Sequence, residues 1–161
     1  MGFDLTVSTP ARPANLKELW EREFAAIGFE VEIYPGFSPD SWDGGFLPFR
    51  VVAAPEEYIG LKLSETALSG FEIDFSPDSA WIHTSMGRTT TEFALQCLGA
   101  ALLAKLCGGE YFDGQNGLEC AGVNALEAVK KEIAAYLPHA RKHGGLTSYP
   151  FPGWEALGQR L

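Results

Sequence analysis

The chain has 161 residues, of which 46% are hydrophobic and 12% aromatic, so it holds enough apolar material for one folded domain and is not disordered throughout. Its 21 acidic and 12 basic residues give a net charge of −9, which repels nucleic acid. The N-terminus shows no basic, apolar leader, and the longest apolar run is too short to cross a membrane. Three cysteines without a paired motif fit a reducing compartment, so we expect a cytoplasmic protein that binds neither nucleic acid nor membranes. The oligomeric state stays open.

The negative charge lies in the first half of the chain. Residues 1–87 carry 14 acidic and 5 basic residues, whereas residues 88–161 carry seven of each. An acidic field attracts a basic surface and speeds the encounter with it. The charge distribution therefore favours a basic protein as the partner.

Alternating apolar and polar residues predict several strands in the first half. Phe3–Ser8 and Phe29–Tyr34 alternate in this way, and an apolar stripe predicts a helix over Asn15–Ile27 between them. Further segments with strand character are Phe49–Ala54, Gly60–Ser64, Phe71–Ser76 and Ala80–Ser85. The short connections between them predict a mostly antiparallel sheet of five or six strands.

The second half has the character of a helical layer. A capping box from Thr89 to Glu92 precedes Phe93–Cys107, which is apolar nearly all round and ends at two glycines. A helix without a polar face has to be covered on most sides, so this segment is expected to be the buried central helix.

Two further elements follow the central helix. Glu110–Asp113 is extended and leads into a glycine-rich turn. A third helix is expected to begin with Asn124 as its cap, and Pro138 is expected to end or kink it.

Together these elements predict one α+β domain over residues 1–161, built as a two-layer sandwich. Residues 1–87 supply the acidic sheet, and residues 88–145 supply the buried helix, which is flanked by two others. Residues 146–161 are expected to form a tail that packs on the core.

Four carboxylates fall on the polar side of two predicted strands. Glu30 and Glu32 alternate with the apolar residues of the first strand, and Glu72 and Asp74 do so in the second. If these strands are neighbours and the helices cover the opposite face, the four side chains form an acidic panel. Close like charges are unfavourable, which indicates a basic partner. The alternative is a polar outer surface with no role beyond solubility.

The loop Pro35–Phe49 combines aromatic and acidic residues. Aromatic side chains contribute much of the binding energy at protein interfaces, so the loop is a second candidate for partner binding. Its alternative role is to plug the core. The candidate residues are Phe37, Asp40, Trp42, Asp43 and Phe46.

No motif in the sequence indicates catalysis, a metal or a cofactor. The chain contains no GxSxG, HExxH, GxGxxG or GxxxxGK[ST] pattern. Cys97 and Cys107 lie about 15 Å apart along one predicted helix, too far for a disulfide. Cys120 follows a turn and is the thiol whose reactivity is of interest. We expect no catalytic residue, no bound metal and no cofactor.

The run LGAALLAKLCGGEYFDGQNG and the capped helix after it resemble a segment of small bacterial proteins, some of which are similar to immunity proteins encoded beside polymorphic secreted toxins. The resemblance covers Thr89–Lys131 and rests on structural residues. It implies a small acidic α+β inhibitor and carries no catalytic residue with it.

Three functions follow from these observations. The first is a non-enzymatic binding protein, most concretely an immunity protein that blocks a toxin by pairing carboxylates with its cationic groups. The second is a small-ligand-binding protein or enzyme with a pocket lined by the loop aromatics and carboxylates. The third is a mimic of nucleic-acid charge that binds a DNA-binding protein.

Overall fold

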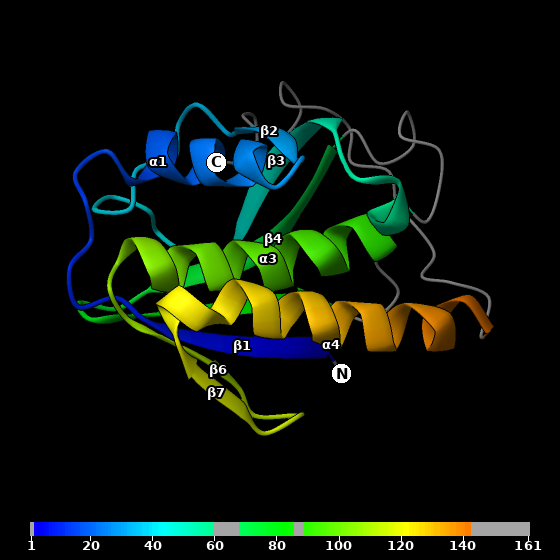
Figure 1. Cartoon of the computed structure of the whole chain (residues 1–161). Helices are drawn as coiled ribbons and strands as arrows, with labels where there is room; N and C mark the ends of the chain where they lie inside the picture. The colour runs from blue at the N-terminus through cyan, green and yellow to red at the C-terminus, as the bar shows by residue number, and fades with distance from the viewer. Residues whose placement is uncertain (1, 60–67, 86–88, 143–161) are drawn as a thin grey trace.

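Seven antiparallel strands form one sheet, and three helices lie side by side over one of its faces (Figure 1). The computed structural model describes residues 2–59, 68–85 and 89–142. The strands are β1 (Gly2–Ser8), β2 (Glu30–Ile33), β3 (Phe46–Ala53), β4 (Leu68–Phe75), β5 (Ser79–Ser85), β6 (Glu110–Asp113) and β7 (Leu118–Ala121). The helices are α1 (Leu16–Ala26), α3 (Thr90–Leu106) and α4 (Gly122–Lys142), with a short 3₁₀ turn η1 (Glu56–Tyr58). The predicted α+β architecture is confirmed, with more strands than the five or six expected.

The order of strands across the sheet is β2-β3-β4-β5-β1-β6-β7. The N-terminal strand β1 therefore lies inside the sheet, where it pairs with β5 along its whole length and with β6 on the other side. Two differences from the prediction concern strand bounds. β3 begins at Phe46, inside the segment expected to be a loop, and β7 was not predicted at all. The predicted strand Gly60–Ser64 falls outside the described residues. Every other expected strand is present.

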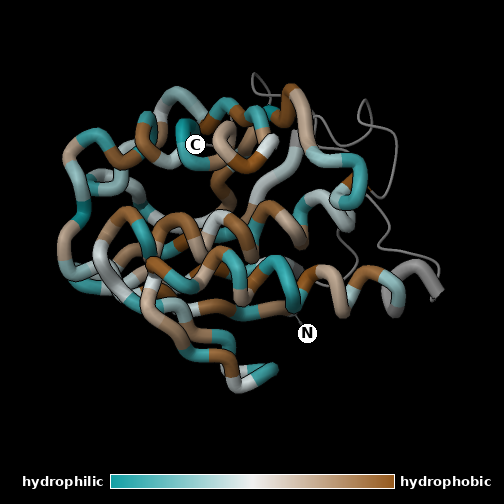
Figure 2. Tube along the Cα trace, in the orientation of Figure 1, coloured by the Kyte–Doolittle hydropathy of each residue, from teal (hydrophilic) through white to brown (hydrophobic). Residues whose placement is uncertain are grey.

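Helix α3 is the centre of the molecule, as its composition predicts. Its capping box is formed: the Thr89 hydroxyl accepts from the Glu92 N–H at 3.1 Å, and the Glu92 carboxylate accepts from the Thr89 N–H at 2.9 Å. Fifteen of its residues are buried, because the sheet lies beneath it and α1 and α4 lie on its flanks. Figure 2 shows the apolar residues of the helices and strands gathered around it.

Two features of α4 correct the prediction. The helix begins at Gly122, so Asn124 is a residue of its first turn and not its cap. The Gly122 N–H donates to the Gly109 carbonyl at 2.8 Å, which fixes the start of α4 beside the end of α3. The helix also continues past Pro138 to Lys142, so of the two expected effects of this proline, an end or a kink, the end does not occur. Proline removes the hydrogen bond to the carbonyl four residues earlier, and because Ala134 is exposed, water can satisfy that carbonyl. The tail 146–161 lies outside the described residues.

Candidate functional site: the open sheet face

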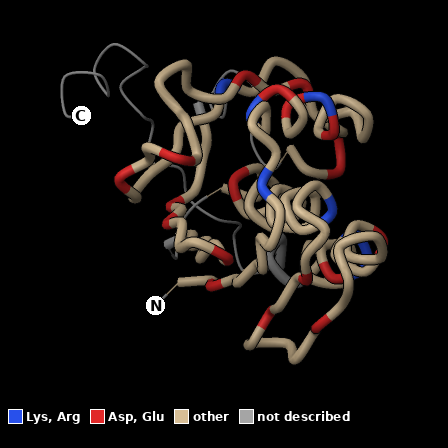
Figure 3. The backbone as a smooth tube through the Cα atoms, turned by 90° about the vertical axis from the view of Figure 1, so that its left-hand side faces the viewer, with Lys and Arg blue, Asp and Glu red and all other residues tan. Residues whose placement is uncertain are grey.

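The sheet has one face that no described helix covers, and we call it the open sheet face. Along the strands, apolar residues that are buried or half-buried under the helices alternate with residues that point the other way. All acidic residues of the strands except Asp113 belong to the second group. Arg50 is the only Lys or Arg in the seven strands. Figure 3 shows the consequence, with most Lys and Arg on one side of the molecule and almost only Asp and Glu on the other. The carboxylates of the open sheet face are Asp4, Glu30, Glu32, Glu72, Asp74, Glu110 and Glu119.

The four panel carboxylates do share this face, but not on neighbouring strands. β3 lies between β2 and β4 and pairs with both. On β3, Arg50 lies opposite Glu32, and its Nη1 is 3.0 Å from the carboxylate. The panel is therefore divided. Glu30 and Glu32 form an edge partly neutralised by arginine, whereas Glu72 and Asp74 belong to the centre of the sheet.

The central carboxylates are interleaved with aromatic rings through strand register. One row across the face runs Phe46, Glu72, His83 and Asp4 on β3, β4, β5 and β1. The next row runs Asp74, Trp81, Thr6, Phe112 and Glu119 from β4 to β7. Residues opposite each other in such rows have side chains in contact range, so acids and rings form one continuous surface.

His83 holds part of this surface in place. Its Nδ1 lies 2.8 Å from the Asp4 carboxylate, which fixes Nδ1–H as the donor and Asp4 as the acceptor. The indole of Trp81 stacks on the imidazole with ring centroids 5.1 Å apart. A side chain at Gly2 would overlap the imidazole, so the ring lies directly over the glycine backbone. Packing and hydrogen bonding thus orient the ring of Trp81 before any partner binds.

Two aromatic residues of the face are exposed to an unusual degree for their size. Trp81 is 39% and Phe112 44% exposed. Large, partly exposed rings among carboxylates are typical of binding surfaces. Sequence reasoning left both out, although the alternation of Trp81 with the buried Ile82 would have placed it on this face.

The loop before β3 has packed aromatic residues and exposed acidic ones. Phe37 is buried at 4% exposure, and the half-buried Trp42 donates its indole N–H to the Ile73 carbonyl at 3.2 Å. Their rings also contact each other, with centroids 5.5 Å apart. This geometry favours the core-plugging alternative for both residues. Asp40 and Asp43 are exposed.

The end of the loop joins the open sheet face. Phe46 is half-buried there, and its ring lies over Gly70 of β4. The Asp74 carboxylate lies over Gly44, where a side chain would overlap it. Of the five loop candidates, Phe46 therefore belongs to the same surface as Glu72 and Asp74.

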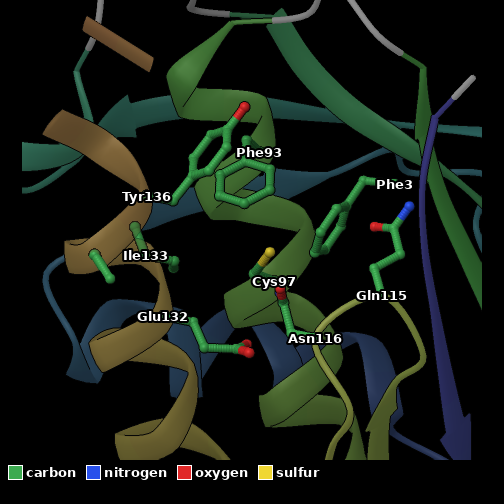
Figure 4. Close-up of a pocket in the computed structure, with 9 residues that line it drawn as sticks. Phe3, Phe93, Cys97, Gln115, Asn116, Glu132, Ile133 and Tyr136 are labelled. Atoms are coloured by element: carbon green, nitrogen blue, oxygen red, sulfur yellow. The ribbon is translucent and has the colours of Figure 1, made fainter. Parts of the chain in front are cut away.

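A pocket of about 550 Å³ lies on the helical side of the sheet (Figure 4). None of the loop aromatics lines it. Its walls come from β1, α3, the β6–β7 turn and α4, which local sequence patterns could not bring together. Its aromatic and polar lining residues are Phe3, Phe93, Cys97, Gln115, Asn116, Glu132 and Tyr136.

Glu132 is the one carboxyl among the described residues that line this pocket. Its burial and the nearby Asp113 carboxylate raise its pKa, while hydrogen bonding from Asn116 opposes the shift. A carboxyl with a raised pKa favours folding below its ordinary pKa of 4.5, and that contribution is lost as the pH rises through the folded-state pKa.

Replacing Glu132 with glutamine is therefore expected to stabilise the fold at pH 7. The gain should be under about 1 kcal/mol, because the side chain is only half-buried and solvent screens its charge. Urea unfolding of both proteins between pH 4 and pH 7 measures it. The difference between the two proteins should shrink towards the acid end, and a difference that grows there would contradict the assignment.

The three cysteines are free thiols. Burial raises the pKa of Cys97 well above its ordinary value and that of Cys107 to about 11. Cys120 is half-buried, and burial together with Glu132 raises its pKa as well. A raised pKa lowers the fraction of reactive thiolate, which favours a structural role for all three.

Within the described ranges, no group of three or more His, Cys, Asp or Glu side chains is arranged to hold a metal ion. No helix in that part of the chain is long and apolar enough to cross a membrane. Comparison with protein-family models, with curated proteins and with solved structures finds no match for this chain.

Proposed function

We propose that this chain is a non-enzymatic binding protein of the cytoplasm whose open sheet face takes up a basic protein, most concretely as the inhibitor of a toxin. The observation that carries the proposal is the combination of seven carboxylates and one arginine on a sheet face with exposed Trp81 and Phe112. The three free cysteines are in keeping with a reducing compartment.

The chemistry of such a complex follows from the arrangement of the face. Carboxylates of Glu72 and Asp74 would pair with Lys or Arg of the partner, and the ring of Trp81, which lies opposite Asp74, would cover apolar surface. A guanidinium or ammonium can also lie over an indole face. Charge complementarity makes the association fast and sensitive to salt, and the toxin would be blocked by occlusion of its cationic site.

A peptide-display selection tests the proposal. The wild-type chain is the bait, and the double variant Glu72→Lys/Asp74→Lys is the counter-selection. We expect recovered peptides to be rich in Lys and Arg, and synthetic copies to bind the double variant at least about tenfold more weakly than the wild type by calorimetry. Binding should weaken further as salt is raised.

The matched control is Glu57→Lys/Glu127→Lys, which makes the same change in net charge on the helical side. It should bind within about twofold of the wild type if the face, and not the overall charge, is responsible. The nearly isosteric variant Glu72→Gln/Asp74→Asn removes the two charges with little change in shape, so it controls for misfolding. Its affinity for the peptides should lie between those of the wild type and the lysine variant. Peptides without excess Lys and Arg, or equal losses in both lysine variants, would contradict the proposal.

The inhibitor role has its own test. The product of the gene beside this one is expressed in bacteria with and without the chain, and growth is measured. We expect the wild type to restore growth and the Glu72→Lys/Asp74→Lys variant to fail. The inhibitor role would be contradicted if the product of the neighbouring gene does not slow growth, or if the variant restores growth as well as the wild type does.

A further inference from the structure

The pocket on the helical side has an acidic end and an aromatic end. Figure 4 shows the Glu132 carboxylate and the Asn116 amide directed towards each other, with Phe93 and Tyr136 together at the other end. The Gln115 side chain stands beside Phe3 and donates to the Gly2 carbonyl at 3.1 Å. None of the residues that line the pocket is Lys or Arg.

The acidic end holds negative charge that the described residues do not neutralise. The buried Asp113 carboxylate organises the β6–β7 turn by accepting from the Gln115 and Asn116 backbone N–H groups at 2.8 and 3.2 Å. The Asn116 amide donates to the same carboxylate at 2.8 Å. Asp113 is therefore fixed within the turn, and its charge acts on Glu132 nearby. A cation beside Glu132 would relieve this like-charge repulsion.

A buried hydroxyl lies next to the same groups. Tyr111 is fully buried, and within the described part of the chain its hydroxyl has no hydrogen-bond partner. Cys97, Glu132 and Asp113 are the charged or ionisable groups that act most strongly on it. A buried polar group without a partner is costly. Tyr111 does not line the pocket, so a buried water next to it, and not the ligand itself, would satisfy its hydroxyl.

The aromatic end offers the surface that suits an organic cation. The rings of Phe3 and Phe93 meet edge to face with centroids 5.0 Å apart, and those of Phe93 and Tyr136 lie 4.6 Å apart. Aromatic rings stabilise both apolar groups and positive charge. The volume of about 550 Å³ is in the range of small-molecule sites.

We propose that this pocket binds a small organic amine, with its ammonium group on the Glu132 carboxylate and the Asn116 amide oxygen and its apolar or aromatic body against Phe3, Phe93 and Tyr136. The site lies on the opposite side of the sheet from the open sheet face. It is thus independent of the proposed protein partner, and a variant of one site leaves the other intact.

Three phenylalkyl probes of similar size and different charge test the proposal on the full chain. They are 2-phenylethylamine, the neutral 2-phenylethanol and the anion 3-phenylpropanoate, titrated by calorimetry and by NMR. We expect the amine to bind at least about tenfold more tightly than the alcohol, since a charge-assisted hydrogen bond separates them, and the anion not to bind.

Variants separate the two ends of the site. Glu132→Gln should remove the preference for the amine over the alcohol, and because this variant is expected to be more stable at pH 7, unfolding cannot account for the loss. Tyr136→Ala should weaken both probes. The control Glu127→Gln lies on the same helix, where its carboxylate pairs with Lys130 at 3.0 Å, and should bind as the wild type does.

Equal binding of amine and alcohol to the wild type would overturn the proposal, as would an unchanged preference in Glu132→Gln. Absence of binding by all three probes at millimolar concentration would overturn it as well. The result of these titrations does not depend on the peptide selection on the open sheet face, so the two proposals can fail separately.

Discussion

Replacing Gly109 with alanine should lower the free energy of unfolding by about 3 kcal/mol or more. A Cβ atom at this position would overlap the carbonyl carbon and oxygen of Ser8, which are backbone atoms and cannot rotate away. The residue is also fixed on both sides, because its N–H donates to Ala104 at 2.9 Å and its carbonyl accepts from Gly122 at 2.8 Å. Relief of the overlap would pull β1 away from the end of α3.

The neighbouring Gly108 provides the matched control. Its φ is +62°, in the left-handed region, but a side chain there would meet no atom within 4 Å. Alanine at this position should cost only about 1 kcal/mol of backbone strain. Urea unfolding of the two variants checks the difference. Equal losses would mean that conformational freedom, and not the close approach to Ser8, explains both glycines.

The second large effect is expected at Trp20, where alanine should cost about 3–5 kcal/mol. The side chain is fully buried, and its indole N–H donates to the Gly99 carbonyl at 3.0 Å. It connects α1 to α3 and to the sheet at once. Its ring contacts are Phe24, Phe37, Phe49 and Phe71.

A second tryptophan, Trp81, provides the control for the Trp20 variant. Trp81→Ala removes the same side chain from the open sheet face, where it is 39% exposed, and should cost less than about 1 kcal/mol. Thermal unfolding of both variants measures the contrast. A large loss at Trp81 would mean that the open sheet face is stabilised by this ring and is less free for a partner than its exposure indicates.

The sequence predicts those elements whose pattern is local and regular. The all-apolar run of α3 and its capping box at Thr89 identify the central helix without knowledge of its neighbours. The start of β3 was hidden because Gly44, Gly45 and Pro48 are typical of loops. Yet Pro48 lies within the strand and its carbonyl accepts from the Tyr34 N–H at 3.0 Å. A proline needs no partner for an N–H, so the strand tolerates it.

The candidate site was predicted only in part because it depends on strand order. Alternation places Glu30, Glu32, Glu72 and Asp74 on outward positions, and all four do lie on the open sheet face. Which strands are neighbours is a property of the whole fold. Because β3 lies between β2 and β4, the four carboxylates form two separate pairs. The pocket at Glu132 escaped prediction for the same reason, since its walls come from segments more than a hundred residues apart.

The interior position of β1 has a consequence for how the chain reaches this structure. β1 is made before either of its partners, because β5 and β6 begin only at Ser79 and Glu110. Its hydrogen bonds to β5 therefore wait until Ser79–Ser85 has been made, and those to β6 wait until Glu110–Asp113 has been made. Pairing over such sequence distances slows folding, because the loop-closure entropy is lost before the contacts form. Until β5 has been made, β1 is unpaired in the nascent chain, and Asp4 near its middle is the charge that discourages premature strand pairing with other chains.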